Sequence, residues 1–265
     1  MPYIDLNYML NKMAYEILTG NHGRLRKLDS SQYKLVKYAD TIAEQTKKDG
    51  GTAIELMQFM CSLGNVITGS LSYRYQGTVY RKEQDTLHDI DMSIPKSKHD
   101  LDSLMPQIKE IIDNRQYRDY NELETYLKAH STYFKEIFAK YPEIRIANAI
   151  VHDNGTLSLG MVYSKDEDVN DDFVNSEGSY ETRLSNLTAE QKEKLYILDF
   201  FFEDSDREFV EDEQYGLKLS KYEESFKHKL QYGRAKDVFD YQNFELFQQF
   251  KDDNLSGEEQ LLYQR

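Results

Sequence analysis

The chain has 265 residues, which is enough for one large domain or two small ones with a substantial core. Acidic side chains number 47 against 33 basic ones, and the net charge of −14 argues against broad nonspecific binding to nucleic acid and against an anionic membrane surface. The only cysteine, Cys61, excludes a disulfide framework within the chain and a cysteine zinc site, and the lack of a membrane-spanning apolar run leads us to expect a cytoplasmic protein without a membrane partner.

The first part of the chain shows the apolar periodicity of helices. Apolar residues recur at helical spacing over residues 6–18 and 31–47. Gly50-Gly51 ends the second helix, and Thr52-Ala53-Ile54-Glu55 has the form of a capping box that begins a third. We therefore expect residues 1–63 to form an N-terminal helical segment that packs on the rest of the protein.

Two short strands follow, and they carry the candidate chemistry. The first is apolar and ends at Gly69-Ser70, while the second begins at Asp89-Ile90-Asp91 and ends at Pro95. Side chains alternate along a strand, so Asp89 and Asp91 point to one face and Ile90 points to the other. Two adjacent carboxylates repel each other and are costly to desolvate, and a divalent cation between them accounts for their pairing.

Helices and then a hairpin are expected in the middle of the chain. Helical patterns cover residues 98–113 and 121–140. Two strand-like segments, 144–151 and 157–163, flank the tight-turn signal Asn154-Gly155.

Residues 165–190 are rich in acidic side chains and predict a solvated loop. A second cation site is the alternative, but the spacing of the acids matches no ordered calcium loop.

The next run, residues 195–203, is short and rich in aromatic and β-branched residues, which is typical of a buried strand. Helical patterns over residues 219–231 and 232–250 predict a helical C-terminal region.

A single carboxylate, Asp199, lies inside the expected buried strand, where an unpaired charge is costly. Together with Asp89 and Asp91 it forms the predicted catalytic site and the predicted set of ligands for Mg²⁺, with Mn²⁺ as an alternative. Gly69-Ser70, at a strand end, presents backbone N–H groups and a hydroxyl to phosphate oxygens. Two cations held by three carboxylates would clamp the attacking and leaving oxygens of a phosphoryl displacement, and Asp199 can take the proton of an incoming hydroxyl.

Gly69-Ser70, Asp89-Ile90-Asp91 and the later Asp199 together resemble the signature of the nucleotidyltransferase superfamily related to DNA polymerase β. The resemblance implies a mixed β-sheet flanked by helices, an NTP bound with Mg²⁺, and transfer of NMP to an acceptor with release of pyrophosphate. The spacing is nearest to that of the abortive-infection toxin and small bacterial branches, which implies a toxin-like role.

The same resemblance assigns four further residues to nucleotide binding. Arg234, Lys236 and Asp237 stand where toxin-type and antibiotic-modifying members carry a basic residue followed by Lys-Asp. This implies that Arg234 and Lys236 face the triphosphate and that Asp237 braces the site. Arg81 matches an Arg that the abortive-infection toxin branch carries upstream of the acids.

Departures from the family pattern leave other interpretations open. Arg74 stands where small bacterial members carry a Gly, and His88 precedes the paired acids where Ser is common. A His-Asp pair alone fits an HD phosphohydrolase, but the remaining histidines lack the helical spacing of that fold. The main alternative is a catalytically silent interaction protein or virus-associated protein on the same fold. For residues 234–241, the alternative is a solvated amphipathic helix.

The sequence therefore predicts an α+β protein with a nucleotidyltransferase core over residues 64–204, interrupted by a helical and hairpin insertion, and a C-terminal helical region over residues 205–265. The expected activity is Mg²⁺-dependent transfer of NMP from an NTP to a hydroxyl acceptor, which is a protein, a small molecule or an RNA end. The acidic balance favours a protein or a small molecule as the acceptor. The sequence does not determine the oligomeric state or the base of the preferred NTP.

Overall fold

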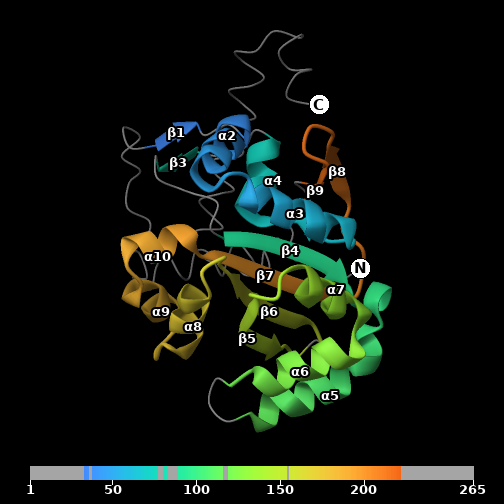
Figure 1. Cartoon of the computed structure of the whole chain (residues 1–265). Coiled ribbons are helices and arrows are strands. Elements are labelled where there is room, and N and C mark those ends of the chain that lie inside the picture. The colour runs from blue at the N-terminus through green and yellow to red at the C-terminus, as the bar shows by residue number, and fades with distance from the viewer. Residues whose placement is uncertain are drawn as a thin grey trace, which may run out of the picture.

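The computed structural model describes residues 33–35, 38–76, 80–82, 89–115, 119–153 and 155–221. In these ranges the chain forms an α+β fold built on a mixed, seven-stranded sheet with the strand order β5-β6-β7-β4-β2-β9-β8 (Figure 1). The pairs β4–β7 and β2–β9 are parallel, and the other neighbouring pairs of this sheet are antiparallel. The expected fold class is confirmed at the level of a mixed sheet flanked by helices.

The strands of this sheet lie far apart in the sequence. In chain order they are β2 Val66–Ile67, β4 Asp89–Pro95, β5 Arg145–Val151, β6 Leu157–Tyr163, β7 Tyr196–Glu203, β8 Phe209–Asp212 and β9 Leu217–Ser220. A separate antiparallel pair is formed by β1 Tyr33–Leu35 and β3 Tyr80–Lys82.

The helices of the described residues connect these strands. They are α2 Tyr38–Asp49, α3 Thr52–Ser62, α4 Gly69–Tyr75, α5 Leu101–Asn114, α6 Asn121–His130, α7 Thr132–Lys140, α8 Glu167–Asn175, α9 Tyr180–Asn186 and α10 Ala189–Lys194. A short 3-10 helix, Lys96–His99, follows β4.

Hydrophobic side chains pack on both faces of the sheet. On one face Met92 and Phe200 are fully buried in the main core, which also contains side chains of α3, α5, α6 and α7. On the other face a smaller cluster joins Val162 and Ile197 of the strands to Phe173 of α8. In Figure 1, α8, α9 and α10 form a separate group beside the sheet, and α5 and α6 lie together beneath β5. Because side chains alternate along β7, the smaller cluster lies on the face that also carries Asp199.

Several predicted elements are confirmed in place. The apolar strand before Gly69-Ser70 is β2, Pro95 is the last residue of β4, and the buried run at 195–203 is β7. The expected hairpin is formed by β5 and β6. Gly155 in its turn has a φ of 79°, a conformation that favours glycine.

Two predicted helices are wrong at their first residues, where the structure has strands instead. The helix expected over residues 31–47 begins only at Tyr38, since Tyr33–Leu35 pairs with β3. Where a helix was expected to begin, Leu219 and Ser220 are the last residues of β9, and Leu219 lies opposite Ile67 of β2. In both stretches a hydrogen-bonded partner from elsewhere in the chain overrides the local apolar spacing.

The acidic stretch at 165–190 is not the expected solvated loop, because it contains α8, α9 and the start of α10. Val169 and Phe173, one turn apart on α8, are buried while the acidic side chains of that helix face outward. The single helix expected over residues 121–140 is two helices separated at Ser131, whose hydroxyl accepts a hydrogen bond from the first turn of α7.

Some predictions fall outside the described residues. These are the helices expected over 6–18 and 232–250 and most of the helix expected over 219–231. The sheet continues beyond residue 204 through β8 and β9. The division of the chain at residues 63 and 204 stays a prediction.

The start of α3 differs from the expected capping box. Gly51 occupies the N-cap position with a φ of 96°, and its residue type provides no side-chain cap. The Asp49 carboxylate instead accepts hydrogen bonds from the amides of Gly51 at 2.8 Å and Ala53 at 3.1 Å. The same carboxylate accepts from the Tyr196 hydroxyl at 2.6 Å and from Gln45 Nε2 at 2.8 Å. Asp49 thereby joins α2, α3 and β7 through one charged group.

Replacing Asp49 tests this junction. Burial opposes the charged form of Asp49, but the hydrogen bonds from Tyr196, Gln45 and the α3 amides outweigh it and lower the pKa of the carboxyl. Asp49→Ala should reduce the free energy of unfolding at pH 7 by about 1–3 kcal/mol, because these donors lose a charged acceptor. Urea unfolding measures the change.

The pH dependence supplies the control for this prediction. A carboxyl whose pKa is lower in the folded than in the unfolded protein contributes its full stabilisation of the fold above the unfolded pKa of about 3.9. That contribution is lost as the pH falls from there through the folded pKa. The difference between wild type and Asp49→Ala should therefore shrink at low pH. Glu44→Ala removes an exposed acid of the same helix and should change little. Equal losses in the two variants at pH 7 would contradict the role of Asp49.

Candidate metal centre

The three predicted acidic ligands meet on two neighbouring strands. Strands β4 and β7 are parallel, with Asp91 directly opposite Asp199 and Asp89 opposite Ile197. One carboxylate oxygen from each of the three acids lies within 4.8 Å of the other two. Asp89 is exposed, and Asp91 and Asp199 are half-buried. Asp199 follows Asp91 by more than a hundred residues of sequence, and the register of one strand pair brings it to the other two acids.

Core packing holds both strands in this register. Met92 follows Asp91 on β4, and Leu198 and Phe200 flank Asp199 on β7. All three apolar side chains are fully buried on the opposite face of the sheet. Since side chains alternate along a strand, burying these residues turns the carboxylates toward the other face. Sliding either strand by one residue would move its carboxylate into the core, so the core also fixes the direction of the acids.

Gly69 lies directly against the carboxylate of Asp91. The turn after β2 is tied to β4 by a hydrogen bond from the Thr68 amide to the Asp91 carbonyl at 2.8 Å. Gly69 has a φ of 66°, and a Cβ built at this position would lie 2.0 Å from Asp91 Oδ2. No side chain fits there, and the left-handed backbone also favours glycine. Ser70 follows in the first turn of α4 and is half-buried.

A second glycine makes room for Asp199 from the other side. Gly160 on β6 is paired with Asp199, and a Cβ at this position would lie 3.2 Å from Asp199 Oδ1. Asn148 of β5 is in turn paired with Gly160. The Cβ of Asn148 lies 3.3 Å from the place that a Cβ at position 160 would take. Sequence reasoning missed both residues. A glycine in the middle of an apolar strand was the available signal, because it often marks a close approach of neighbouring groups.

The donor set suits a hard divalent cation. Three carboxylates so close together raise each other's free energy when all are charged, and a cation among them offsets that repulsion. Mg²⁺ and Mn²⁺ prefer oxygen ligands of this kind. Asp89, Asp91 and Asp199 are therefore the residues that would hold such an ion, and the identity of the metal stays a prediction.

The other predicted nucleotide-binding residues are not brought into this site by the described residues. Arg81 lies in β3, where the structure describes the backbone only. Arg234, Lys236 and Asp237 lie outside the described residues. Their assignment to the triphosphate stays a prediction.

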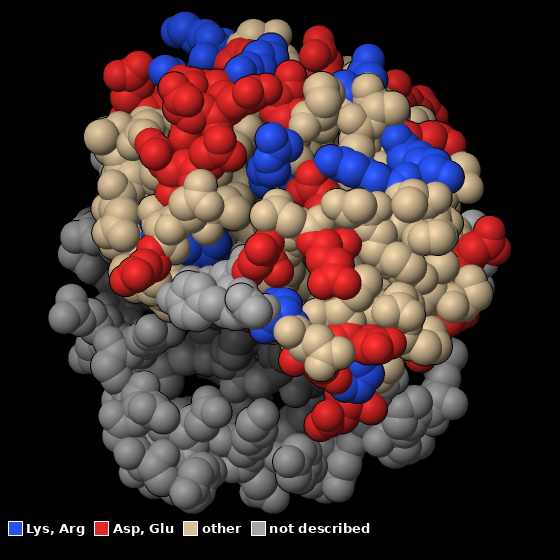
Figure 2. Space-filling model, turned by 60° about the horizontal axis from the view of Figure 1, so that its bottom comes forward, with Lys and Arg blue, Asp and Glu red and all other residues tan. Residues whose placement is uncertain are grey.

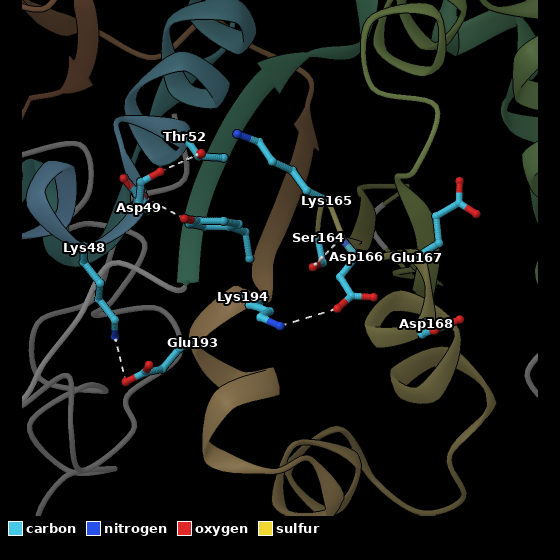
Figure 3. Close-up of a pocket in the computed structure, with 11 residues that line it drawn as sticks. Lys48, Asp49, Thr52, Ser164, Lys165, Asp166, Glu167, Asp168, Glu193 and Lys194 are labelled. Atoms are coloured by element: carbon cyan, nitrogen blue, oxygen red, sulfur yellow. Dashed lines mark hydrogen bonds and ion pairs between the residues drawn. The ribbon is translucent and has the colours of Figure 1, made fainter.

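A pocket of about 620 Å³ lies near the start of β7 (Figure 3). It is lined by Lys48, Asp49, Thr52, Ser164, Lys165, Asp166, Glu167, Asp168, Glu193, Lys194 and Tyr196. Lys48 pairs with Glu193 and Lys194 with Asp166, each at 3.5 Å, so much of the charge in the pocket is balanced locally. Burial, followed by the hydrogen bond to Asp49, raises the pKa of Tyr196. None of the three candidate metal ligands lines this pocket.

The charge on the surface agrees with the acidic composition. Figure 2 shows acidic side chains gathered in groups over the described surface in view, with smaller groups of Lys and Arg between them. Among the described residues, no helix has both the length and the apolar character needed to cross a bilayer.

Substitution of Gly69 tests how closely the backbone approaches Asp91. Gly69→Ala places a methyl group on the Asp91 carboxylate, so we expect the affinity for Mn²⁺ to fall by at least about tenfold. Gly216 has nearly the same φ, 65°, but an added Cβ there meets nothing within 4 Å. Gly216→Ala therefore carries the same backbone strain without the clash and should keep the wild-type affinity. Titration of Mn²⁺ by electron paramagnetic resonance compares them, and equal affinities in the two variants would refute the contact.

Comparison of the chain with protein-family models, with curated protein sequences and with solved structures gives no significant match. A function for this protein is therefore inferred from the geometry of its own residues.

Proposed function

We propose that this chain is a nucleotidyltransferase that depends on a divalent cation and moves NMP from an NTP to a hydroxyl acceptor. The observation that carries the proposal is the group of Asp89, Asp91 and Asp199 on adjacent parallel strands, with a carboxylate oxygen of each within 4.8 Å of the others. Gly69, against Asp91 at the end of β2, supports it, because the chain turns there without a side chain that would block the approach of a phosphate.

The acids have defined tasks in this reaction. A divalent cation, when bound, supplies neutralising charge to the phosphate oxygens. Asp89 and Asp91 would hold it from β4, and Asp199 would hold it from β7. The acceptor oxygen forms a bond to the α-phosphorus, the bond to the β-phosphate oxygen breaks, and pyrophosphate leaves. Asp199, which is half-buried beside the others, accepts the proton of the acceptor hydroxyl.

The finer features of the proposal come from the resemblance of the motifs. They are the DNA polymerase β-like fold family, Mg²⁺ or Mn²⁺ as the cation, a cytoplasmic location and a toxin-like role. Arg81, Arg234 and Lys236 would contact the triphosphate, and Asp237 would brace the site. The acidic surface favours a protein or small-molecule acceptor over a large RNA.

Label transfer tests the activity. The full chain is incubated with each α-labelled NTP, Mg²⁺ and a cell extract, and label is followed into protein, nucleic acid and small molecules. We expect Asp89→Asn/Asp91→Asn to lower transfer by about a hundredfold or more, because the cation loses two charged ligands. The size of the labelled product identifies the acceptor class.

The matched control is Asp168→Asn/Asp171→Asn, which removes two exposed acids of α8 and changes the net charge equally. It should retain wild-type transfer. Absence of label with all four nucleotides, or equal label with the two double variants, contradicts the proposal. In that case a stable protein partner recovered with the full chain would favour the catalytically silent alternative.

A further inference from the structure

A row of four residues crosses the sheet at the level of the candidate metal centre. Strand pairing places Asn148 of β5 beside Gly160 of β6, Gly160 beside Asp199 of β7, and Asp199 beside Asp91 of β4. The Cβ of Asn148 and the carboxylate of Asp199 lie on either side of the space that a side chain at position 160 would fill. The amide of Asn148 and the carboxylate of Asp199 therefore occupy the same face of the sheet, with only a glycine between them.

A β-bulge brings Asn148 to this face. The pairing register between β5 and β6 shifts between Ile146 and Asn148, so Ala147 is an extra residue. Ile146 on one side of the shift and Ala149 on the other both belong to the main core. Regular alternation from Ile146 would point residue 148 into that same core, whereas the extra residue directs it to the opposite face. Bulges commonly redirect a side chain in this way beside functional sites.

Two buried side chains hold the bulge and its asparagine. Arg183 of α9 is 3% exposed, and its Nη2 donates a hydrogen bond to the Ala147 carbonyl at 3.2 Å. The guanidinium of Arg183 also lies over the ring of Phe173, 4.7 Å from its centroid. The hydroxyl of Tyr120 donates to Asn148 Oδ1 at 3.4 Å. That contact uses the carbonyl oxygen of the Asn148 amide. The Nδ2 group of the same amide can therefore act as a hydrogen-bond donor to another acceptor.

We propose that Asn148 is a positioning residue of the candidate metal centre and supplies the outer hydrogen-bond partner of Asp199 when a divalent cation is bound. Carboxylates that bind metals are usually oriented by such partners, and loss of one typically lowers metal affinity by about 10–100-fold. Gly160 permits this contact because it leaves the space between the two side chains open. The inference rests on the proposed cation site but does not require nucleotide or an acceptor.

Mn²⁺ titration of the full chain tests the role of Asn148. Asn148→Leu keeps the approximate size and removes the amide, and it should raise the dissociation constant for Mn²⁺ about tenfold. Asn148→Gln keeps an amide donor and should remain within about threefold of wild type. If Asn148→Leu binds Mn²⁺ as wild type does, or Asn148→Gln binds as weakly as Asn148→Leu, the inference is overturned.

A double-mutant cycle separates a positioning role from a general structural one. If Asn148 acts through Asp199, adding Asn148→Leu to Asp199→Asn should change Mn²⁺ affinity by less than about twofold. An equal fold-loss in both backgrounds would indicate a structural effect and refute the inference. Ser158→Ala is the matched control, because Ser158 lies two residues before Gly160 on the same strand and contacts His152 at 2.8 Å rather than the metal centre. It should leave the affinity unchanged.

The outcomes for this inference and for the proposed function can be told apart. If wild type binds no Mn²⁺, the metal centre and the role of Asn148 both fail. If wild type binds Mn²⁺ but the Asn148 variants do not show the expected affinities, the role of Asn148 is refuted and the proposed metal centre is retained. If Mn²⁺ binding follows the expected pattern but no label is transferred from any NTP, Asn148 keeps its role and the transfer reaction is contradicted.

Discussion

The parallel pairing of β4 with β7 is the constraint on which the rest of the site depends. This pairing sets Asp91 opposite Asp199 and leaves Asp89 within reach of both. It is maintained by apolar side chains that alternate with the acids, so the free energy gained by burying Met92, Leu198 and Phe200 also holds three like charges together. The core and the candidate metal centre are consequently two faces of the same pair of strands.

Neighbouring elements are shaped around these carboxylates. Gly69 and Gly160 approach Asp91 and Asp199 from opposite sides, and neither position has room for a Cβ without displacing an acid or the neighbouring Asn148. Gly69 is the first residue of α4 and Gly160 lies within β6, so each acid is confined by a different element. Confinement of this kind pre-organises ligands, which lowers the entropy lost when an ion or substrate binds.

The sequence pattern predicted those site residues whose position depends on the regular alternation of side chains along a strand. Asp89, Asp91 and Asp199 could be found because each stands within an apolar strand and strand periodicity fixes its face. Asn148 could not, because the extra residue at Ala147 reverses that periodicity and nothing in the local composition marks the bulge. The helix α8 was missed because its acidic side chains hid the spacing of Val169 and Phe173, and β9 was missed because its partner β2 lies about 150 residues earlier in the chain.

The bulge in β5 also affects how this protein meets other molecules. Among the described residues β5 ends the sheet, and an end strand with regular backbone groups can recruit a strand from another chain. Here the Ile146 amide donates to Glu124 Oε2 at 3.5 Å, and the Ala147 carbonyl accepts from Arg183. Two groups that an incoming strand would need are thus occupied by side chains of the same molecule. The irregularity that turns Asn148 toward Asp199 therefore also discourages edge-to-edge aggregation at this side of the sheet.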